Sequence, residues 1–312
     1  MQNNEKVVGI FGGNSFLAKY TIEKLCKEGY RMKIGTRKPW LVNQIRTAAA
    51  PGQIILMPTN VFNPKSVEEV LRDCHTVINF CGQLFEKKTS FLELHSQWPE
   101  MLSQMSNKFG IKQLIHISAL NSSKNHPSKY MQSKMLGEKK IQENFENYFI
   151  LRPSLIVGNG DDSFFSTFAT IANFSPIIPL PGGGGTKFSP VHATDCANAI
   201  VKLLETENPK NRIFEATGPS NYSLRNLIEI FLQEIKKRRL LVSVPWSILK
   251  LQSYFLQYLP KPPITPDQIL LLQHNSVATG KYPLLTTLGI TPQDIQSIFS
   301  FWKRFRVGGQ FN

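Results

Sequence analysis

Short apolar runs alternate with amphipathic stretches along the first half of the chain. A run of about four to eight apolar residues is typical of a strand buried on both faces, whereas apolar residues three or four positions apart indicate a helix. The apolar runs predict strands at residues 7–11, 31–36, 54–57, 76–80, 113–118 and 148–151. The amphipathic stretches predict helices at residues 15–28, 66–74, 92–109 and 128–144.

This regular alternation of strands and helices, which runs from residue 6 to about residue 152, indicates the fold class. Parallel strands need crossover connections, and right-handed crossovers place helices on both faces of the sheet. We therefore predict an α/β fold with a Rossmann-like, doubly wound parallel sheet. Residues 1–152, with returning segments near 187–218, form the expected NAD(P)-binding domain.

The rhythm breaks after residue 152, where prolines and four consecutive glycines at 182–185 predict a long loop. Further on, the pattern predicts helices at 194–204, 223–236 and 291–305, and a strand at 213–216. We expect residues 153–312 to form a smaller, mostly helical C-terminal lobe that contacts a substrate or a partner.

The turn after the first predicted strand is the candidate phosphate site. Such a turn needs a glycine for the tight bend, which Gly12 supplies, and a small residue where the helix packs on the strand, which Ala18 supplies. Ser15 stands where a second glycine is usual, and its hydroxyl can donate a hydrogen bond. The alternative is that the chain keeps the fold but has lost the ability to bind a nucleotide. The expected cofactor contacts are Gly12, Asn14, Ser15, Phe16 and Leu17.

The end of the second predicted strand bears on the choice of cofactor. Sites that prefer NAD place an acidic residue there to bind the ribose 2′-hydroxyl, but this chain has Arg37 and Lys38. Two cations suit a 2′-phosphate, so NADP(H) is the favoured cofactor, although NAD(H) is also possible. The alternative is that Arg37 and Lys38 belong to a solvated basic loop and bind no cofactor. Asn79 and Gly82, at the end of the fourth strand, are expected to lie close to the cofactor.

A tyrosine and a lysine four residues apart are the candidate catalytic pair. Tyr130 and Lys134 share one face of the helix predicted at 128–144, and a lysine one turn from a phenol lowers the pKa of that phenol. Tyr130 can then act as a general acid or base, and Ser118 at the end of the fifth strand can bind the substrate oxygen. The alternative is a surface pair without a role.

Composition and charge narrow the partners. The net charge of +14 indicates attraction to anions, although an AT-rich genome also explains part of the lysine excess. Nothing except the net charge supports nucleic-acid binding, so no nucleic-acid partner is expected. The four cysteines form no CxxC pair, and no metal spacing occurs. We see no signal peptide and no apolar run of the roughly 20 residues that span a bilayer, so we expect a cytoplasmic protein or a processed form that lacks its presequence.

A segment in the second half is unusually apolar and aromatic. Residues 246–259 combine tryptophan, tyrosines and leucines with a single charged residue, and the basic cluster 236–239 lies just before them. This pattern indicates peripheral contact with an anionic membrane or a partner. The alternative is a helix packed on the main domain with solvated basic residues nearby.

The chain resembles the extended, atypical short-chain dehydrogenases/reductases, through residues 7–37 and 113–153. It is more closely similar to the branch of the NAD-dependent epimerase/dehydratase family that includes the NAD(P)H-binding accessory subunit of respiratory complex I (alpha-subcomplex subunit 9). The residues that carry this likeness are 11–18, 114–120, 128–138, 151–154, 187–191, 214–219 and 265–272.

This resemblance implies a bound NADPH and association with a membrane-bound respiratory or quinone-related system, on the cytoplasmic or matrix face of the inner membrane. It also adds Pro153 to the expected cofactor contacts. Relatives in the complex are thought to be structural, so catalysis stays open here. The competing hypothesis is an active sugar-nucleotide epimerase/dehydratase or reductase, which has no need of the apolar segment at 245–275.

Overall fold

The computed structural model describes residues 6–40, 49–160, 164–206, 212–259, 262–298 and 302. The chain divides into two units. Unit 1 comprises Met1–Pro153, Ala193–Ala216 and Thr279–Thr291. Unit 2 comprises Ser154–His192, Thr217–Ala278 and Pro292–Asn312.

Unit 1 is built on a seven-stranded sheet whose spatial order is β11-β6-β5-β4-β1-β2-β3, with every pair of neighbours parallel. The order reverses between β1 and β4, as it does in doubly wound folds. This confirms the predicted Rossmann-like sheet. The strands are β1 (Val7–Phe11), β2 (Arg31–Thr36), β3 (Ile54–Pro58), β4 (Thr76–Asn79), β5 (Gln113–Ile117), β6 (Tyr148–Pro153) and β11 (Ile213–Ala216).

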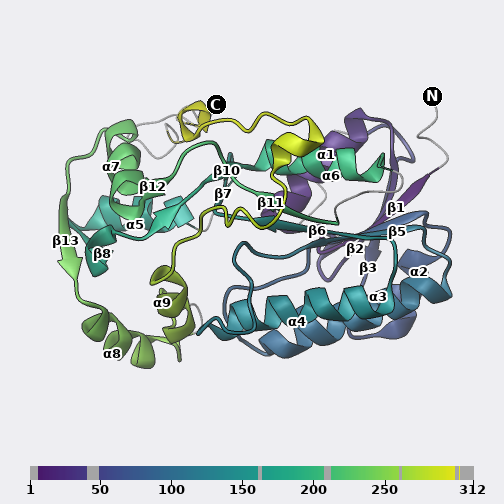
Figure 1. The fold of residues 1–312 in the computed structure, drawn as a ribbon, viewed down its shortest axis with the longest axis horizontal. Coiled ribbons are helices and arrows are strands. Elements are labelled where there is room, and N and C mark those ends of the chain that lie inside the picture. The colour runs from purple at the N-terminus through teal and green to yellow at the C-terminus, as the bar shows by residue number, and fades with distance from the viewer. Residues whose placement is uncertain are drawn as a thin grey trace. The chain divides into compact units, whose positions relative to one another are not determined.

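Helices cover both faces of this sheet (Figure 1). One face carries α1 (Phe16–Lys27) and α6 (Ala193–Leu204), which pack on each other. The other carries α2 (Pro64–Leu71), α3 (Trp98–Lys108) and α4 (Lys129–Asn144). A short 3-10 helix, η5 (Leu285–Leu288), returns to unit 1 against α6.

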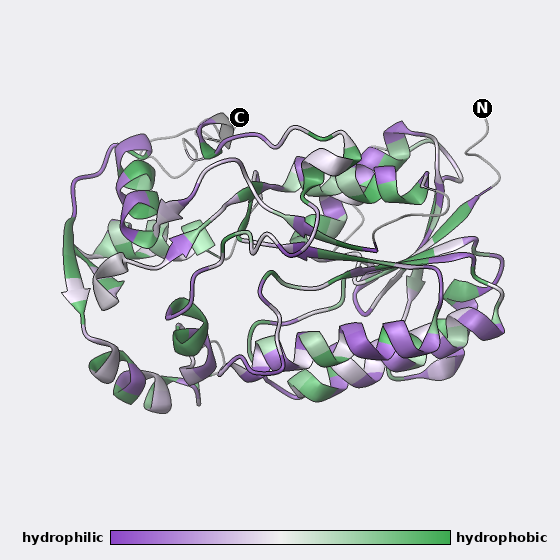
Figure 2. Cartoon of the chain, in the orientation of Figure 1, coloured by the Kyte–Doolittle hydropathy of each residue, from purple (hydrophilic) through white to green (hydrophobic). Residues whose placement is uncertain are grey.

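The core between the sheet and α3 is apolar and closely packed. Trp98 and Phe11 are fully buried, and their rings meet edge to face with centroids 5.0 Å apart. Hydrophobic residues dominate the strands, whereas hydrophilic and hydrophobic residues alternate along α3 and α4 (Figure 2). The helices therefore bury one side against the sheet and expose the other, as their sequence pattern predicts.

The helix predicted at 92–109 is interrupted by a π-helical turn, η3 (Glu93–Gln97), which leads into α3. The physical reason is Pro99, which has no N–H to donate to the carbonyl of His95 four residues earlier. That carbonyl instead faces α4 at Gly137, where a Cβ would lie 1.8 Å from the oxygen. Only glycine permits α4 to approach this turn.

Unit 2 contains the helices α5 (Phe164–Phe174), α7 (Leu224–Glu234), α8 (Trp246–Leu256) and α9 (Pro266–Leu272). Its core gathers the rings of Phe165, Phe231 and Trp302, with centroid separations of 4.5–5.3 Å. It also has three two-stranded sheets, which pair β7 (Ile156–Val157) with β10 (Val191–His192), β9 (Lys187–Phe188) with β12 (Tyr222–Ser223), and β8 (Ile177–Pro181) with β13 (Leu240–Val244).

Two expectations for the second half need correction. The segment predicted as a proline-rich loop contains strand β8, which pairs with β13. Its prolines are tolerated because each strand of a two-stranded sheet is an edge strand and forms backbone hydrogen bonds on one side only. The helix predicted from residue 291 does not begin there: among the described residues the segment has only the 3-10 helix η6 (Ile295–Ile298). The remainder of the predicted range, apart from residue 302, lies outside the described residues.

Candidate functional site

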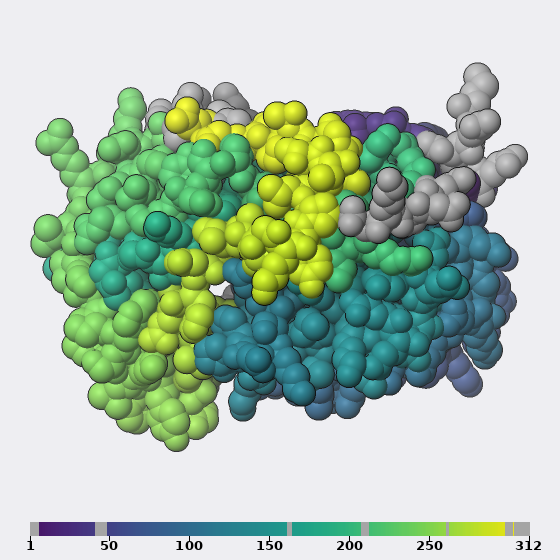
Figure 3. Space-filling view, viewed as in Figure 1, coloured from purple at the N-terminus to yellow at the C-terminus, as the bar shows by residue number. Residues whose placement is uncertain are grey.

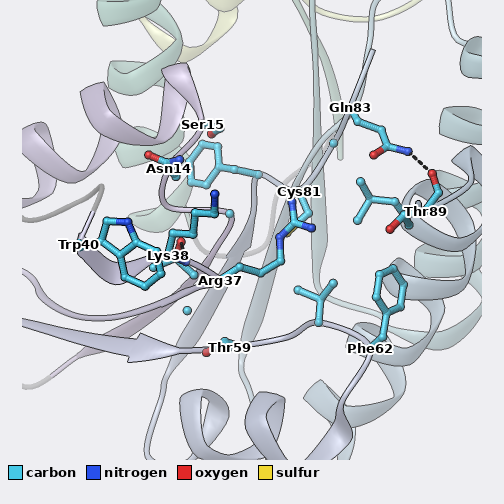
Figure 4. Close-up of a pocket in the computed structure, with 17 residues that line it drawn as sticks. Asn14, Ser15, Arg37, Lys38, Trp40, Thr59, Phe62, Cys81, Gln83 and Thr89 are labelled. Carbon is cyan, nitrogen blue, oxygen red and sulfur yellow. Dashed lines mark hydrogen bonds between the residues drawn. The ribbon is translucent and has the colours of Figure 1, made fainter. Parts of the chain in front are cut away.

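A cavity of about 570 Å³ lies in unit 1 at the carboxyl ends of β1, β2, β3 and β4 (Figure 4). Its size is within the range of roughly 300–1,000 Å³ that suits small-molecule ligands. The crevice at the reversal point of a doubly wound sheet is where such folds bind ligands. The residues that line it include Gly12, Asn14, Ser15, Gly35, Arg37, Lys38, Trp40, Phe62, Cys81, Gly82 and Gln83.

Gly12 makes the turn between β1 and α1 with a backbone angle φ of +80°. A Cβ at this position would lie 2.9 Å from the backbone nitrogen of Cys81 and 2.9 Å from the carbonyl carbon of Phe80. Glycine is therefore required twice, for its left-handed conformation and for the close approach to the end of β4. The turn and the end of β4 together form one wall of the cavity.

Ser15 is the N-cap of α1, and its Oγ accepts a hydrogen bond from the backbone N–H of Ala18 at 3.2 Å. Asn14 and Ser15 line the cavity, while Phe16 and Leu17 form the first turn of α1 and are absent from the described lining. The first N–H groups of a helix and its dipole favour an anion at this end. The turn thus fits a phosphate group in front of α1.

Arg37 and Lys38 follow β2 directly, and both line the cavity together with Trp40. Figure 4 shows Lys38 on the side of the cavity that carries Asn14 and Ser15, and the Arg37 side chain extending toward Cys81. The described lining contains no aspartate or glutamate. The cavity is therefore positively charged, which suits a ligand with several phosphates.

Asn79 supports the cavity from behind. Its side chain is fully buried, and its Oδ1 accepts hydrogen bonds from the backbone N–H of Cys81 and from Nε1 of Trp98, each at 3.0 Å. Its Nδ2 therefore donates to Nδ1 of His116, also at 3.0 Å. Asn79 holds the chain at Cys81 and Gly82, which line the cavity, but is itself absent from the described lining.

Lys134 lies beside Gly82. Its Nζ donates to the carbonyl of Ile117 at 3.1 Å and lies 3.2 Å from where a Cβ on Gly82 would stand. Burial lowers the pKa of Lys134 to about 8, against the opposing effects of Cys81 and Glu138. The lysine therefore remains mostly charged at pH 7, directly behind the cavity wall.

Replacing Lys134 by methionine tests this pKa. Between pH 8 and 10.5 this lysine is mostly deprotonated in the folded protein but still protonated in the unfolded chain. The unfolded state therefore binds more protons than the folded state, so the free energy of unfolding rises with pH across that window. We expect the free energy of unfolding of the wild type, relative to Lys134→Met, to rise by about 3 kcal/mol over this range. Denaturant titrations at several pH values measure it. Lys140→Met is the control, because Glu100 raises the pKa of Lys140; an equal rise there contradicts the assignment.

Tyr130 stands one turn before Lys134 on α4, in contact with η3. Its ring meets His95 edge to face at 5.3 Å and Phe91 at 5.8 Å between centroids. The structure thus brings Tyr130 and Lys134 onto one helix, with Lys134 next to the cavity-lining Gly82.

His95 is a residue that the sequence reasoning missed. Its Nε2 accepts from the backbone N–H of Gln83 at 3.1 Å, so its Nδ1 donates to Oγ of Ser133 at 2.9 Å. Burial, together with the charge of Lys134, lowers the pKa of His95 to about 2, so the ring is neutral. His95 therefore links the cavity wall at Gln83 to the helix of Tyr130. No local pattern signals this link, because its partners are far apart in sequence.

Ser118 belongs to a buried polar cluster. Its hydroxyl donates to Oε1 of Glu138, which also accepts from Ser122 at 2.8 Å and from Nε of Arg152 at 2.9 Å. Pro153, which ends β6, is also buried, and its carbonyl accepts from the N–H of Leu120 at 2.9 Å. Neither Ser118 nor Pro153 is among the described residues that line the cavity.

Metal-binding clusters and membrane-spanning helices are both absent from the described part of the chain. No group of three or more histidine, cysteine, aspartate or glutamate residues there is arranged to hold a metal ion. No helix there is both long enough and apolar enough to span a bilayer.

Comparison with known proteins gives a consistent result. Residues 8–216 match the NAD dependent epimerase/dehydratase family. The mitochondrial 40 kDa subunit of NADH-ubiquinone oxidoreductase from Neurospora crassa is 27% identical over 306 residues, covering 97% of this chain and 80% of that protein. Mitochondrial NADH dehydrogenase [ubiquinone] 1 alpha subcomplex subunit 9 from Mus musculus is 26% identical over 297 residues, covering 94% of this chain and 78% of that protein.

Solved structures share the fold at low sequence identity. Triphenylmethane reductase from Citrobacter sp. superposes with a TM-score of 0.75 at 13% identity, covering 96% of this chain and 99% of that one. UDP-glucose 4-epimerase from Bifidobacterium longum, solved with NAD+ and UDP, gives a TM-score of 0.73 at 14% identity, with coverage of 96% and 98%.

Proposed function

The chain belongs to the NAD dependent epimerase/dehydratase family, and from that membership we propose that it binds a nicotinamide dinucleotide, NADP(H) in preference to NAD(H). The observation that carries the preference is the pair Arg37 and Lys38, which line a cavity whose described lining has no carboxylate. A ribose 2′-phosphate needs cations at the end of β2, whereas a 2′-hydroxyl is normally bound by an acidic residue there.

Different parts of the cavity would bind different parts of this cofactor. The N-terminus of α1, with Gly12, Asn14 and Ser15, would hold the pyrophosphate. Arg37 and Lys38 would hold the 2′-phosphate. Gly82, which has no side chain, would leave room for the cofactor to extend toward α4. Phe16 and Leu17 contribute through the backbone of the first turn of α1.

Replacing Arg37 and Lys38 together by alanine is expected to weaken NADPH binding about tenfold to a hundredfold and to leave NADH binding unchanged within about threefold. Each charged hydrogen bond to a phosphate contributes roughly 1.5–3 kcal/mol when it forms, and exposure reduces that amount here. Fluorescence or calorimetric titration with both nucleotides measures the change.

Arg31→Ala is the matched control, because Arg31 is also an exposed arginine but begins β2, at the opposite end of the strand from Arg37. It is expected to bind both nucleotides as the wild type does. Equal losses of NADPH and NADH affinity in the double variant would contradict the assignment of these two cations to the 2′-phosphate.

We assign the protein a role as a cofactor-stabilised component of a respiratory or quinone-related system, peripheral to a membrane on its cytoplasmic or matrix side. The names of its relatives, which are mitochondrial NADH dehydrogenase subunits, support this role. The bound cofactor would stabilise unit 1 by mass action, since a ligand that binds only the folded state adds to its stability.

A second candidate is an active reductase or epimerase, and the observation in its favour is the Tyr130–Lys134 pair on α4. The bound dinucleotide supplies or accepts a hydride at a carbonyl or alcohol carbon. In this scheme the phenol of Tyr130 exchanges a proton with the substrate oxygen, and the charge of Lys134 stabilises the phenolate. Ser118 acts through Glu138, with which its hydroxyl is bonded, and so positions α4.

Tyr130→Phe separates the two candidates. We expect this variant to bind NADPH within about threefold of the wild type and to co-purify with the membrane system as the wild type does, because only a hydroxyl is removed. General acid–base catalysis contributes about 10²–10⁴-fold. A loss of that size in NADPH-dependent reduction of a carbonyl or quinone would favour the enzyme over the structural role.

A further inference from the structure

Helix α8 in unit 2 turns its most apolar side chains toward solvent. Leu251 is 65% exposed and Phe255 is 67% exposed, whereas the side of the helix that packs inward carries Leu249 and Ser253. A surface helix of a globular domain normally buries its apolar stripe. Helix α8 buries Leu249 but also leaves Leu251 and Phe255 exposed.

The exposed residues of α8 share one side of the helix. Ile248, Leu251 and Phe255 follow each other at intervals of three and four residues, which places them in one row. Tyr254 and Lys250 lie along one edge of that row. Residues of this helix lie at the molecular surface in the space-filling view (Figure 3). We define the α8 surface as Ile248, Leu251, Tyr254, Phe255, Tyr258 and Leu259, all of them exposed.

Exposed apolar residues continue on the strand that leads into α8. In the ladder of β13 and β8, Leu240 is paired with Ile177, and their exposed fractions are 64% and 45%. Phe174, just before β8, is 88% exposed. Exposed apolar residues in this number are typical of a contact site with a membrane or a protein.

The charged residues that surround α8 in the sequence are all basic, between Glu234 before them and Asp267 on α9 after them. From residue 235 to residue 266 the sequence contains six basic residues, at 236–239, 250 and 261, and no acidic residue. Within that run, Arg239 Nε donates to the carbonyl of Ala172 at 2.8 Å, and Lys237 Nζ donates to Asn173 Oδ1, so both are tied to the end of α5. Lys236 and Arg238 are exposed.

We propose that the α8 surface and the basic segment 236–239 dock on the interface of an anionic lipid bilayer. The apolar row would enter the boundary between headgroups and acyl chains, Tyr254 and Tyr258 would keep their hydroxyls near the headgroups, and the basic residues would bind lipid phosphates. Charge complementarity selects this occupant, because every charge in the segment is positive. The inference rests on the proposed membrane-associated role and names the surface that performs it.

Vesicle co-sedimentation of the full chain tests the proposal, with vesicles of phosphatidylcholine alone and of phosphatidylcholine mixed with phosphatidylglycerol. We expect binding to the anionic vesicles that weakens with salt. Leu251→Ser combined with Phe255→Ser is expected to weaken it about tenfold or more, because both side chains lose apolar area that the lipid would cover. Lys236→Gln combined with Arg238→Gln is expected to weaken it about tenfold at low salt.

A matched control substitutes exposed apolar residues of unit 1. Ile55→Ser combined with Leu136→Ser removes two side chains with exposed fractions of 46% and 38%, and it is expected to leave vesicle binding unchanged. Absence of binding to anionic vesicles, or equal binding by the Leu251/Phe255 variant, would overturn the proposal. A third result would also overturn it: the wild type is a dimer that binds no vesicles, and the Leu251/Phe255 variant is a monomer. The α8 surface would then bind a second copy of the chain.

NADPH titration of the same samples separates this inference from the proposed function. Loss of vesicle binding in the Leu251/Phe255 variant with unchanged NADPH affinity supports the α8 surface as an independent site. If the wild type binds NADPH but no vesicles, only the docking surface is wrong. If it binds vesicles but neither nucleotide, the docking surface stands and the cofactor proposal is wrong.

Discussion

Gly12→Ala is expected to weaken NADPH binding at least about a hundredfold, which corresponds to about 2.8 kcal/mol. The new Cβ would lie 2.9 Å from the backbone of both Phe80 and Cys81, and no side-chain rotation can relieve a contact with backbone. The turn and the end of β4 must therefore separate. Both form the wall of the cavity, so the positions of the phosphate-binding N–H groups change with them.

Gly29→Ala is the matched control for this substitution. Gly29 has the same φ of +80°, but a Cβ there would meet no atom within 4 Å. Both variants bear the strain of a left-handed alanine, about 1–2 kcal/mol, and only Gly12→Ala also displaces β4. Thermal unfolding and NADPH titration of both variants separate strain from displacement. Equal NADPH affinities in the two variants would show that the Gly12 turn is not part of the cofactor site.

Glu138→Gln is expected to lower the free energy of unfolding by about 3–5 kcal/mol, the usual cost of removing one partner from a buried ion pair. Glu138 is fully buried and Arg152 is 4% exposed, and the Arg152 guanidinium also lies over the ring of Tyr282 at 4.5 Å. Glutamine keeps the volume of the side chain but leaves the arginine charge without a counter-charge. Denaturant titration at pH 7 measures the loss.

Glu100→Gln on the same sheet face provides the comparison. Glu100 pairs with Lys140 of α4 at 2.8 Å, but the two side chains are 33% and 36% exposed. Solvent screens such a pair, so its loss is expected to lower the free energy of unfolding far less than the loss of the Glu138–Arg152 pair. If the two substitutions destabilise the protein equally, burial does not determine the contribution of the Glu138–Arg152 pair.

This buried pair also matters for the site. Glu138 lies one turn after Lys134 on α4, and it binds Ser118 and Ser122 after β5 and Arg152 on β6. The cluster therefore fixes α4 against two strand ends and sets the position of the Tyr130–Lys134 pair. We expect a variant that disrupts it to alter NADPH affinity as well as stability.

Local pattern was sufficient for the fold of unit 1, and it predicted several site residues from their places at strand ends. The six predicted strands of residues 7–151 agree with the structure within two residues at either end, because a buried parallel strand must be apolar along its length. Gly12, Arg37 and Gly82 are predicted as cofactor contacts from their places at strand ends. Carboxyl ends of parallel strands share one edge of the sheet, so these residues meet in one cavity.

Other features were out of reach of local pattern. The bond between His95 and Ser133 joins residues 38 positions apart, and the close approach of η3 to α4 joins the carbonyl of His95 to Gly137, which is also far away in the sequence. The hydroxyl of Ser118 was expected to face a substrate, and the structure bonds it to Glu138, 20 residues away. The two short strands β8 and β13 also pair only because distant segments meet.

The sequence by itself therefore determined the doubly wound parallel sheet, the glycine turn before α1 and the basic end of β2, since periodicity and strand-end chemistry are local properties. Only the tertiary structure decided which polar groups are buried together and which face of α8 is left exposed. Burial and pairing depend on contacts between residues far apart along the chain, and side-chain spacing does not record those contacts.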